Sequence, residues 1–167
     1  MIKTKNSHKD QIKPQPKKTV NKSNFQKNNS IKKILVPLDG SKHCFRALDM
    51  AISLSSHYSS SITGIHIFDL PITLEFSIID PVGERLKKKI LGVMKTAKLR
   101  CESQKVPFES IMKHGKVGPA IIDLAKKEKF DVIIIGKRGI SSVSEIFLGS
   151  VSHSVVHHTE CSIIVVR

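Results

Sequence analysis

From residue 31 onward, short apolar runs alternate with longer segments in which apolar residues recur every three or four positions. Runs of about four to eight residues that are rich in Ile and Val, bounded by turn residues, are typical of buried strands. We therefore expect five β-strands, at residues 34–38, 62–68, 108–112, 132–135 and 162–166.

The segments between these strands have the period of amphipathic helices. The first begins after Asp39-Gly40-Ser41, where Ser41 is a suitable N-cap, and the third carries Pro119 in its first turn. The fourth runs from about Gly149 to His158. The second is the longest, and its apolar stripe consists of Val82, Leu86, Ile90, Val93, Met94, Ala97 and Cys101.

This alternation of strands and helices is typical of a parallel sheet that helices cover on both faces. We expect residues 31–167 to form one α/β domain, a three-layer α/β/α sandwich with a five-stranded parallel sheet. It should be doubly wound and Rossmann-like, with strand order 3-2-1-4-5. Such sheets bind ligands beyond the carboxyl ends of their strands, where the strand order switches, so the loops after the first and fourth strands are the candidate site.

Charge is concentrated in the first 30 residues. They contain eight Lys and one Asp, a net charge of +7, which is half of the chain's formal charge of +14. Polar residues and Pro dominate the rest of this segment, which has too few apolar residues to offset the entropy lost on ordering. We interpret residues 1–30 as a disordered Lys-rich tail.

Several protein classes are disfavoured by the composition. The tail has no apolar h-region, and no stretch of the chain approaches the 18 or so apolar residues that a membrane helix needs. The three cysteines are widely spaced and form no CxxC pair. We therefore expect a soluble, cytoplasmic protein with reduced cysteines and no membrane partner.

The strongest motif follows the fourth strand. Gly136-Lys137-Arg138-Gly139 precedes nine residues and then Gly149-Ser150, which opens the last helix. Gly136 would let the chain turn sharply off the strand, and Gly139 would let backbone N–H groups approach an anion. The free N–H groups of the helix N-terminus complete a phosphate site, with Lys137 and Arg138 supplying charge. Glu145 fits poorly, since a carboxylate facing phosphates would repel them, and the glycines could also serve only as turns and caps.

These segments resemble the universal stress protein family. The resemblance rests on the glycine motif, on KKILVPLDGS at residues 32–41, on GIHI at 64–67 and on CSIIVVR at 161–167, and it covers residues 31–167. It implies a fold like that of the adenine nucleotide alpha hydrolases and, for the ATP-binding branch, a site for ATP or AMP with or without Mg²⁺. Asp39 and Ile67 would lie beside the adenosine. The binding residues that we expect are Pro37, Leu38, Asp39, Ile67, Ile135, Gly136, Arg138, Gly139, Gly149, Ser150 and Val151.

Asp39 also has a meaning apart from the resemblance. A carboxylate just past the first strand can accept hydrogen bonds from ribose hydroxyls or an adenine amino group. The alternative is that Asp39 caps the first helix.

Other chemistry finds little support. A receiver domain needs an aspartate at the end of the third strand, where this chain has Met112-Lys113-His114-Gly115, and neither a P-loop nor a GxGxxG loop is present. No nucleophile, base and orienting group can be assembled, so we expect at most slow ATP hydrolysis. His153 and His157 have metal-ligand spacing but no evident third ligand, and we expect no metal site there. His66 should be a hydrogen-bonded core histidine.

We therefore predict a nucleotide-binding regulatory protein with a signalling or stress-response role and as yet unidentified protein partners. It should be a homodimer through the apolar last strand, Ser162 to Val166, because this strand would otherwise be a bare sheet edge. One alternative is a nucleotide-free dimeric interaction module. The other is a tether through the tail, which lacks Arg and has Phe25 as its single aromatic residue, so its contact with nucleic acid or another polyanion would be weak and non-specific.

Overall fold

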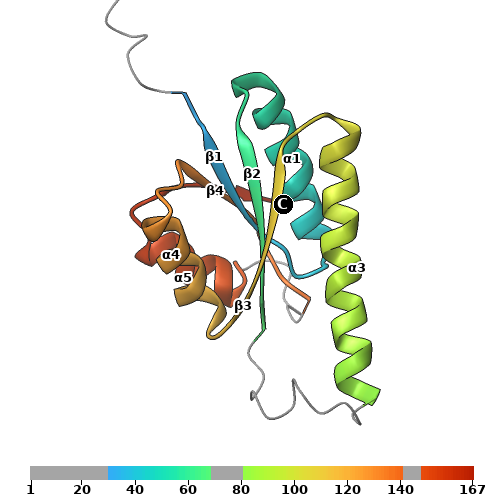
Figure 1. The fold of residues 1–167 in the computed structure, drawn as a ribbon. Coiled ribbons are helices and arrows are strands. Elements are labelled where there is room, and N and C mark those ends of the chain that lie inside the picture. The colour runs from blue at the N-terminus through green and yellow to red at the C-terminus, as the bar shows by residue number, and fades with distance from the viewer. Residues whose placement is uncertain (1–29, 69–80, 141–147) are drawn as a thin grey trace, which may run out of the picture.

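The computed structural model describes residues 30–68, 81–140 and 148–167, so the predicted tail lies almost wholly outside the described ranges. Strands and helices alternate along the described chain (Figure 1). The elements are β1 (Lys33–Pro37), α1 (Lys42–Tyr58), β2 (Ser61–Phe68), α3 (Pro81–Ser103), β3 (Phe108–His114), α4 (Val117–Lys127), β4 (Val132–Gly136), α5 (Ser150–His158) and β5 (Ser162–Val166).

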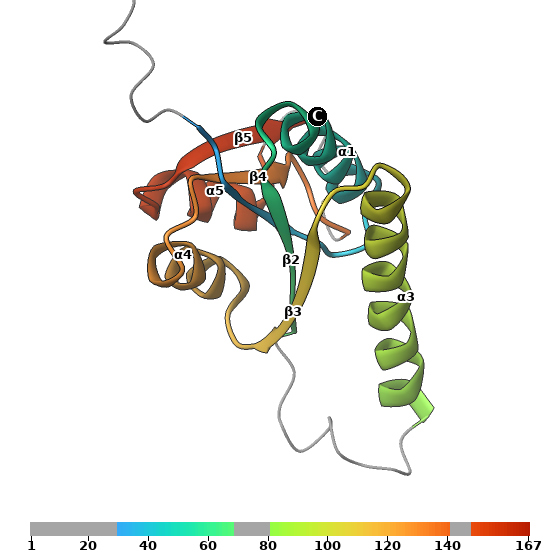
Figure 2. The same cartoon turned by 45° about the horizontal axis from the view of Figure 1, so that its top comes forward.

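The five strands form one parallel sheet in the order β3-β2-β1-β4-β5, which confirms the predicted fold and strand order. Helices α1 and α3 cover one face of the sheet, and α4 and α5 cover the other (Figures 1 and 2). The chain leaves β1 toward β2 and β3 and later returns to add β4 and β5 on the opposite side. The order therefore reverses between β1 and β4, where doubly wound sheets bind their ligands.

Two apolar clusters, one on each face of the sheet, hold the layers together. The side chains of a strand alternate between the faces, so Ile34 and Val36 pack with α1 and α3, whereas Leu35 of the same strand packs with α4 and α5. Central strands that are covered on both faces must be apolar throughout, and every residue of β4 is buried. This explains the apolar runs at Ile34–Val36 in β1 and Val132–Ile135 in β4.

The element boundaries follow local hydrogen bonds. The Ser41 hydroxyl accepts from the Cys44 N–H at 3.1 Å, which confirms Ser41 as the N-cap of α1. Strand β3 runs two residues past its predicted end because β2 continues to pair with it as far as His114. Helix α5 begins at Ser150, with Gly149 as its N-cap.

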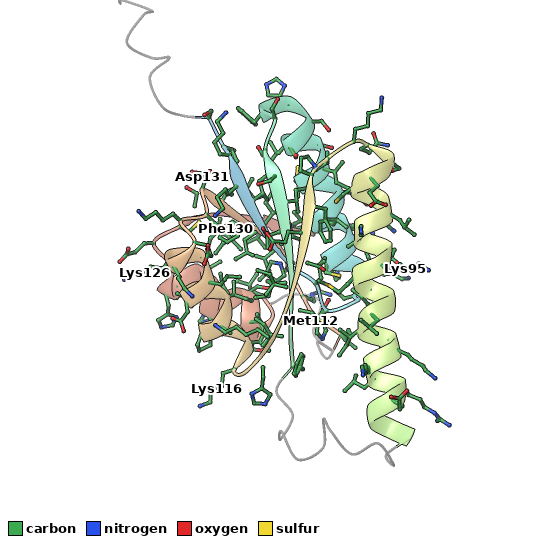
Figure 3. The ribbon with its side chains drawn as sticks, in the orientation of Figure 1. Lys95, Met112, Lys116, Lys126, Phe130 and Asp131 are labelled. Carbon is green, nitrogen blue, oxygen red and sulfur yellow. The ribbon has the colours of Figure 1, made fainter. Side chains whose placement is uncertain are left out.

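Basic side chains occupy the outer helix surfaces. Figure 3 shows Lys95, Lys116 and Lys126 pointing away from the sheet. Arg100, which the helical pattern places on the solvated face of α3, bonds Asp49 of α1 at 2.9 Å and lies 4.7 Å from the centre of the Phe45 ring. Among the described residues, no helix is both long and apolar enough to cross a membrane.

Candidate functional site

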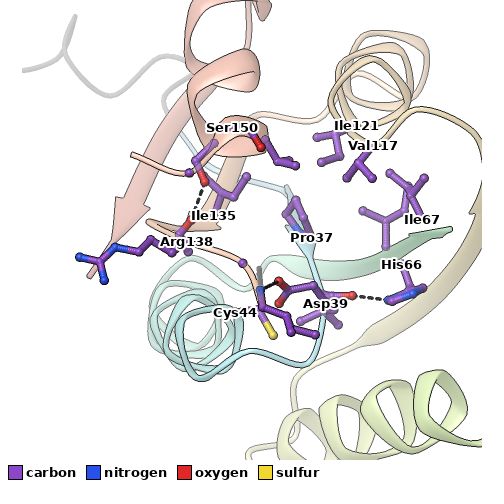
Figure 4. Close-up of a pocket in the computed structure, with 18 of the residues that line it drawn as sticks. Pro37, Asp39, Cys44, His66, Ile67, Val117, Ile121, Ile135, Arg138 and Ser150 are labelled. Carbon is purple, nitrogen blue, oxygen red and sulfur yellow. Dashed lines mark hydrogen bonds between the residues drawn. The ribbon is translucent and has the colours of Figure 1, made fainter. Parts of the chain in front are cut away.

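A cavity of about 480 Å³ opens at the carboxyl edge of the sheet, at the ends of β1, β2 and β4 (Figure 4). Cavities of roughly 300–1,000 Å³ are the usual size of small-molecule sites. All eleven residues expected from the sequence line this one cavity. They are Pro37, Leu38, Asp39, Ile67, Ile135, Gly136, Arg138, Gly139, Gly149, Ser150 and Val151.

The cavity also has walls that the sequence did not identify. Val117 and Ile121 project from the first turns of α4, and Figure 4 shows them beside Ile67 on one side, with Ile135 and Ser150 on the other. An amphipathic pattern shows that such residues are buried but not that they border a ligand site. The remaining unexpected lining residues are Cys44, Ile65, His66, Ile140, Leu148 and Ser152.

The glycines of the motif are required by close packing. A Cβ on Gly136 would lie 2.7–2.8 Å from backbone and side-chain atoms of His43 in α1, and one on Gly139 would lie 2.6 Å from an oxygen of Asp39. A Cβ on Gly149 would lie 3.3 Å from the Cα of Arg138. None of the three has a positive φ. Position 136 needs glycine for the close approach of α1, and the chain bends at Lys137, directly after it.

The N-terminus of α5 is fixed against the end of β4. The Gly149 N–H donates to the Lys137 carbonyl at 2.9 Å, and the Ser152 hydroxyl donates to the Gly136 carbonyl at 2.7 Å. No side chain caps α5, and its first turn contains no acidic residue. The first N–H groups of a helix have no partner within the helix, and its dipole makes this end positive. The wall of the cavity at Ser150 and Val151 is therefore suited to an anion.

Asp39 lies between β1 and the glycine motif. One carboxylate oxygen accepts the Ser41 N–H at 2.9 Å, and the other accepts the Ile140 N–H at 3.0 Å. Ser41, and not Asp39, is therefore the N-cap of α1, and the alternative interpretation of Asp39 as the cap is wrong.

Two other polar residues differ from expectation. His66 is half-buried and lines the cavity instead of lying in the core, and its Nδ1–H donates to the Leu38 carbonyl at 2.6 Å. Arg138 is among the lining residues, but its guanidinium points away from the other labelled side chains in Figure 4. Lys137 is not among the lining residues, and Glu145 lies outside the described ranges.

The cysteine in the cavity is unsuited to catalysis. Burial, assisted by the negative charge of Asp39, raises the pKa of the Cys44 thiol from 9.0 to about 11, and its Sγ–H donates to the Ser41 carbonyl at 3.2 Å. A nucleophilic cysteine needs a lowered pKa. The described residues also contain no cluster of three or more potential metal ligands, although the rings of His153 and His157 lie 4.3 Å apart.

The fold and the cavity define a doubly wound α/β protein with a ligand-sized site at its switch point. More specifically, the chain belongs to the universal stress protein family, which it matches over residues 30–167. It is 30% identical over 145 residues to universal stress protein YxiE of Bacillus subtilis, an alignment that covers 81% of this chain and 98% of that protein.

Solved structures show the same fold. Universal stress protein UspA from Lactobacillus plantarum superposes with a TM-score of 0.69 at 23% identity, covering 84% of this chain and 100% of that one. A universal stress protein family protein from Arabidopsis thaliana with AMP bound has a TM-score of 0.62 at 20% identity, and the match covers 81% of this chain and 90% of that one.

Proposed function

We propose that the cavity binds an adenine nucleotide, ATP or AMP, and that the protein acts as a nucleotide-dependent regulator in signalling or the stress response. The observation that carries the proposal is the shared cavity itself. It brings the glycine motif and the N-terminus of α5 to one wall and an apolar surface to another. The AMP-bound relative from Arabidopsis supports the choice of adenine.

The two walls suit the two ends of a nucleotide. Ile67, Val117 and Ile121 offer an apolar surface on which a base can pack. The backbone N–H groups near Gly139 and at Ser150 offer donors to phosphates. Asp39 is the sole carboxylate among the lining residues of the described chain, and both its oxygens already accept N–H groups, so Mg²⁺ would arrive on the phosphates.

Binding without rapid turnover is the activity that these residues support. The Cys44 thiol remains protonated at neutral pH because of its raised pKa. Both carboxylate oxygens of Asp39 already accept backbone N–H groups, so its geometry suits holding the chain rather than taking a proton from a ligand. We therefore propose at most slow ATP hydrolysis, in a cytoplasmic protein that dimerises through β5.

Calorimetry with the full chain tests the proposal. We expect ATP and AMP to bind with micromolar affinity and the Gly149→Val variant to bind about tenfold more weakly or not at all, because the side chain would enter the space beside Arg138. Gly92→Ala is the matched control, since a Cβ on Gly92 of α3 would meet nothing within 4 Å. If the wild type binds no adenine nucleotide, the nucleotide-free interaction module is the better description.

A further inference from the structure

The carboxylate of Asp39 joins two segments that are far apart in the sequence. Its bond to the Ser41 N–H, at 2.9 Å, is local. Its bond to the Ile140 N–H, at 3.0 Å, spans 101 residues and reaches the glycine motif just after Gly139. A carboxylate that accepts backbone N–H groups makes charge-assisted hydrogen bonds, which are about twice as strong as neutral ones.

The Asp39 carboxylate packs closely against Gly139, in the space that a side chain at this position would occupy. A Cβ on Gly139 would lie 2.6 Å from the Asp39 Oδ2 and 3.8 Å from its Cγ; apart from the adjoining residues, no other atom of the described ranges would lie within 4 Å. Among the described residues, Asp39 is therefore what requires glycine at this position.

Asp39 itself is held on a fixed support. The Leu38 N–H donates to the Ile65 carbonyl at 2.8 Å, and the Leu38 carbonyl accepts from His66 at 2.6 Å. The start of the motif is fixed as well, since the Lys137 N–H donates to the Val166 carbonyl at 2.6 Å. Beyond Lys137, the Ile140 N–H donates to Asp39 at 3.0 Å, and the Ser41 hydroxyl donates to the Arg138 carbonyl at a longer 3.4 Å.

We propose that Asp39 is a positioning residue that fastens the glycine motif to the end of β1, so that phosphate binding depends on Asp39 even for a ligand without adenosine. This inference rests on the proposed nucleotide site and deepens it. The role differs from a contact to adenosine, which would affect only ligands that contain one. Positioning and simple electrostatics also predict opposite effects of removing the carboxylate on phosphate affinity. Loss of the positioning role lowers the affinity, whereas removing a negative charge near phosphates would by itself raise it.

Site-resolved NMR titrations of the full chain separate these roles. ATP and inorganic tripolyphosphate are the two probes, followed through the amide signals of Gly149 and Ser150 so that binding by the Lys-rich tail does not interfere. We expect Asp39→Ala to lower the affinity for both ligands by a similar factor, about tenfold or more. Asp123→Ala, which changes an exposed aspartate of α4, should change neither affinity.

The other outcomes are distinct. If Asp39→Ala weakens ATP alone, Asp39 contacts adenosine and the positioning role is wrong. If it strengthens tripolyphosphate binding, charge repulsion dominates and the positioning role is again wrong. If the wild type binds neither probe at these amides, the proposed nucleotide site itself fails.

A double-mutant cycle tests the contact without any ligand. Gly139→Ala should lower the urea midpoint of the wild type, because its Cβ would overlap the Asp39 carboxylate. The same substitution should cost nothing in an Asp39→Ala background, where the overlapping atoms are gone. Additive effects of the two substitutions would overturn the inference. If the alanine variant does not fold, Asp39→Asn, which keeps one acceptor oxygen, replaces it in the titrations. In the cycle it is replaced by Asp39→Ser, whose shorter side chain also lacks the overlapping δ oxygen.

Discussion

Replacing Gly136 with alanine should destabilise the fold, although both residues are small and the site is at the end of a strand. Gly136 closes β4, and the first turn of α1 packs directly on it. An alanine Cβ would lie 2.7 Å from the carbonyl carbon of His43 and 2.8 Å from its carbonyl oxygen. These are backbone atoms, so the overlap cannot be relieved by rotating a side chain, and α1 must move away from the sheet.

The magnitude follows from two opposing effects. Overpacking of a close-packed interior costs about 1–3 kcal/mol, and contact with backbone places this site toward the upper part of that range. Alanine also restricts the unfolded chain, which returns about 0.4–1 kcal/mol. We expect a net loss of about 2 kcal/mol in the free energy of unfolding, or a fall of roughly 6–10 °C in Tm for a domain of this size.

Urea denaturation followed by circular dichroism measures this loss, and Gly92→Ala is the matched control. Gly92 lies on the exposed side of α3, where a Cβ meets nothing within 4 Å. Alanine there should stabilise the protein by about 0.5–1 kcal/mol, because glycine is costly within helices. The two substitutions should therefore have opposite signs. A Gly136→Ala variant as stable as the wild type would refute the packing argument.

Three further predictions concern other parts of the structure. The raised pKa of Cys44, about 11 against 9.0, means that the unfolded chain loses this proton first as pH rises. The thiol therefore contributes its full share of the free energy of unfolding below pH 9, and this share is lost as the pH rises toward 11. Between pH 8 and pH 10 the free energy of unfolding should fall more for the wild type than for Cys44→Ala. Equal falls would argue against the raised pKa. Arg100→Ala should cost about 0.5–1.5 kcal/mol, since the half-exposed bond to Asp49 is worth little and ring contact adds a similar amount; an unchanged urea midpoint would show that neither contributes. Val165→Lys, on the exposed side of β5, should convert the proposed dimer to a monomer in light scattering. Met112→Lys, on the opposite edge strand β3, should leave the dimer intact. A wild type that is monomeric at micromolar concentration would exclude the dimer.

The sequence by itself determined the layered fold. Apolar runs at strand length and helical stripes depend only on local period, and the uninterrupted Ile and Val of β4 already require cover on both faces. The glycine motif could likewise be assigned to the ligand edge, because parallel strands end at one edge and the motif follows a strand. All eleven expected residues accordingly line one cavity.

The tertiary structure alone decided what each residue contacts. The neighbours of Gly136 and Gly139, His43 and Asp39, are about a hundred positions away in the chain, and no local pattern indicates that they meet. The same holds for Val117 and Ile121, whose helical spacing shows burial but not a border with the cavity. Local period fixes which face of an element is apolar, whereas contacts between loops depend on how the layers pack. For this reason Asp39, the residue whose role depends most on a distant segment, is the one that the sequence described least completely.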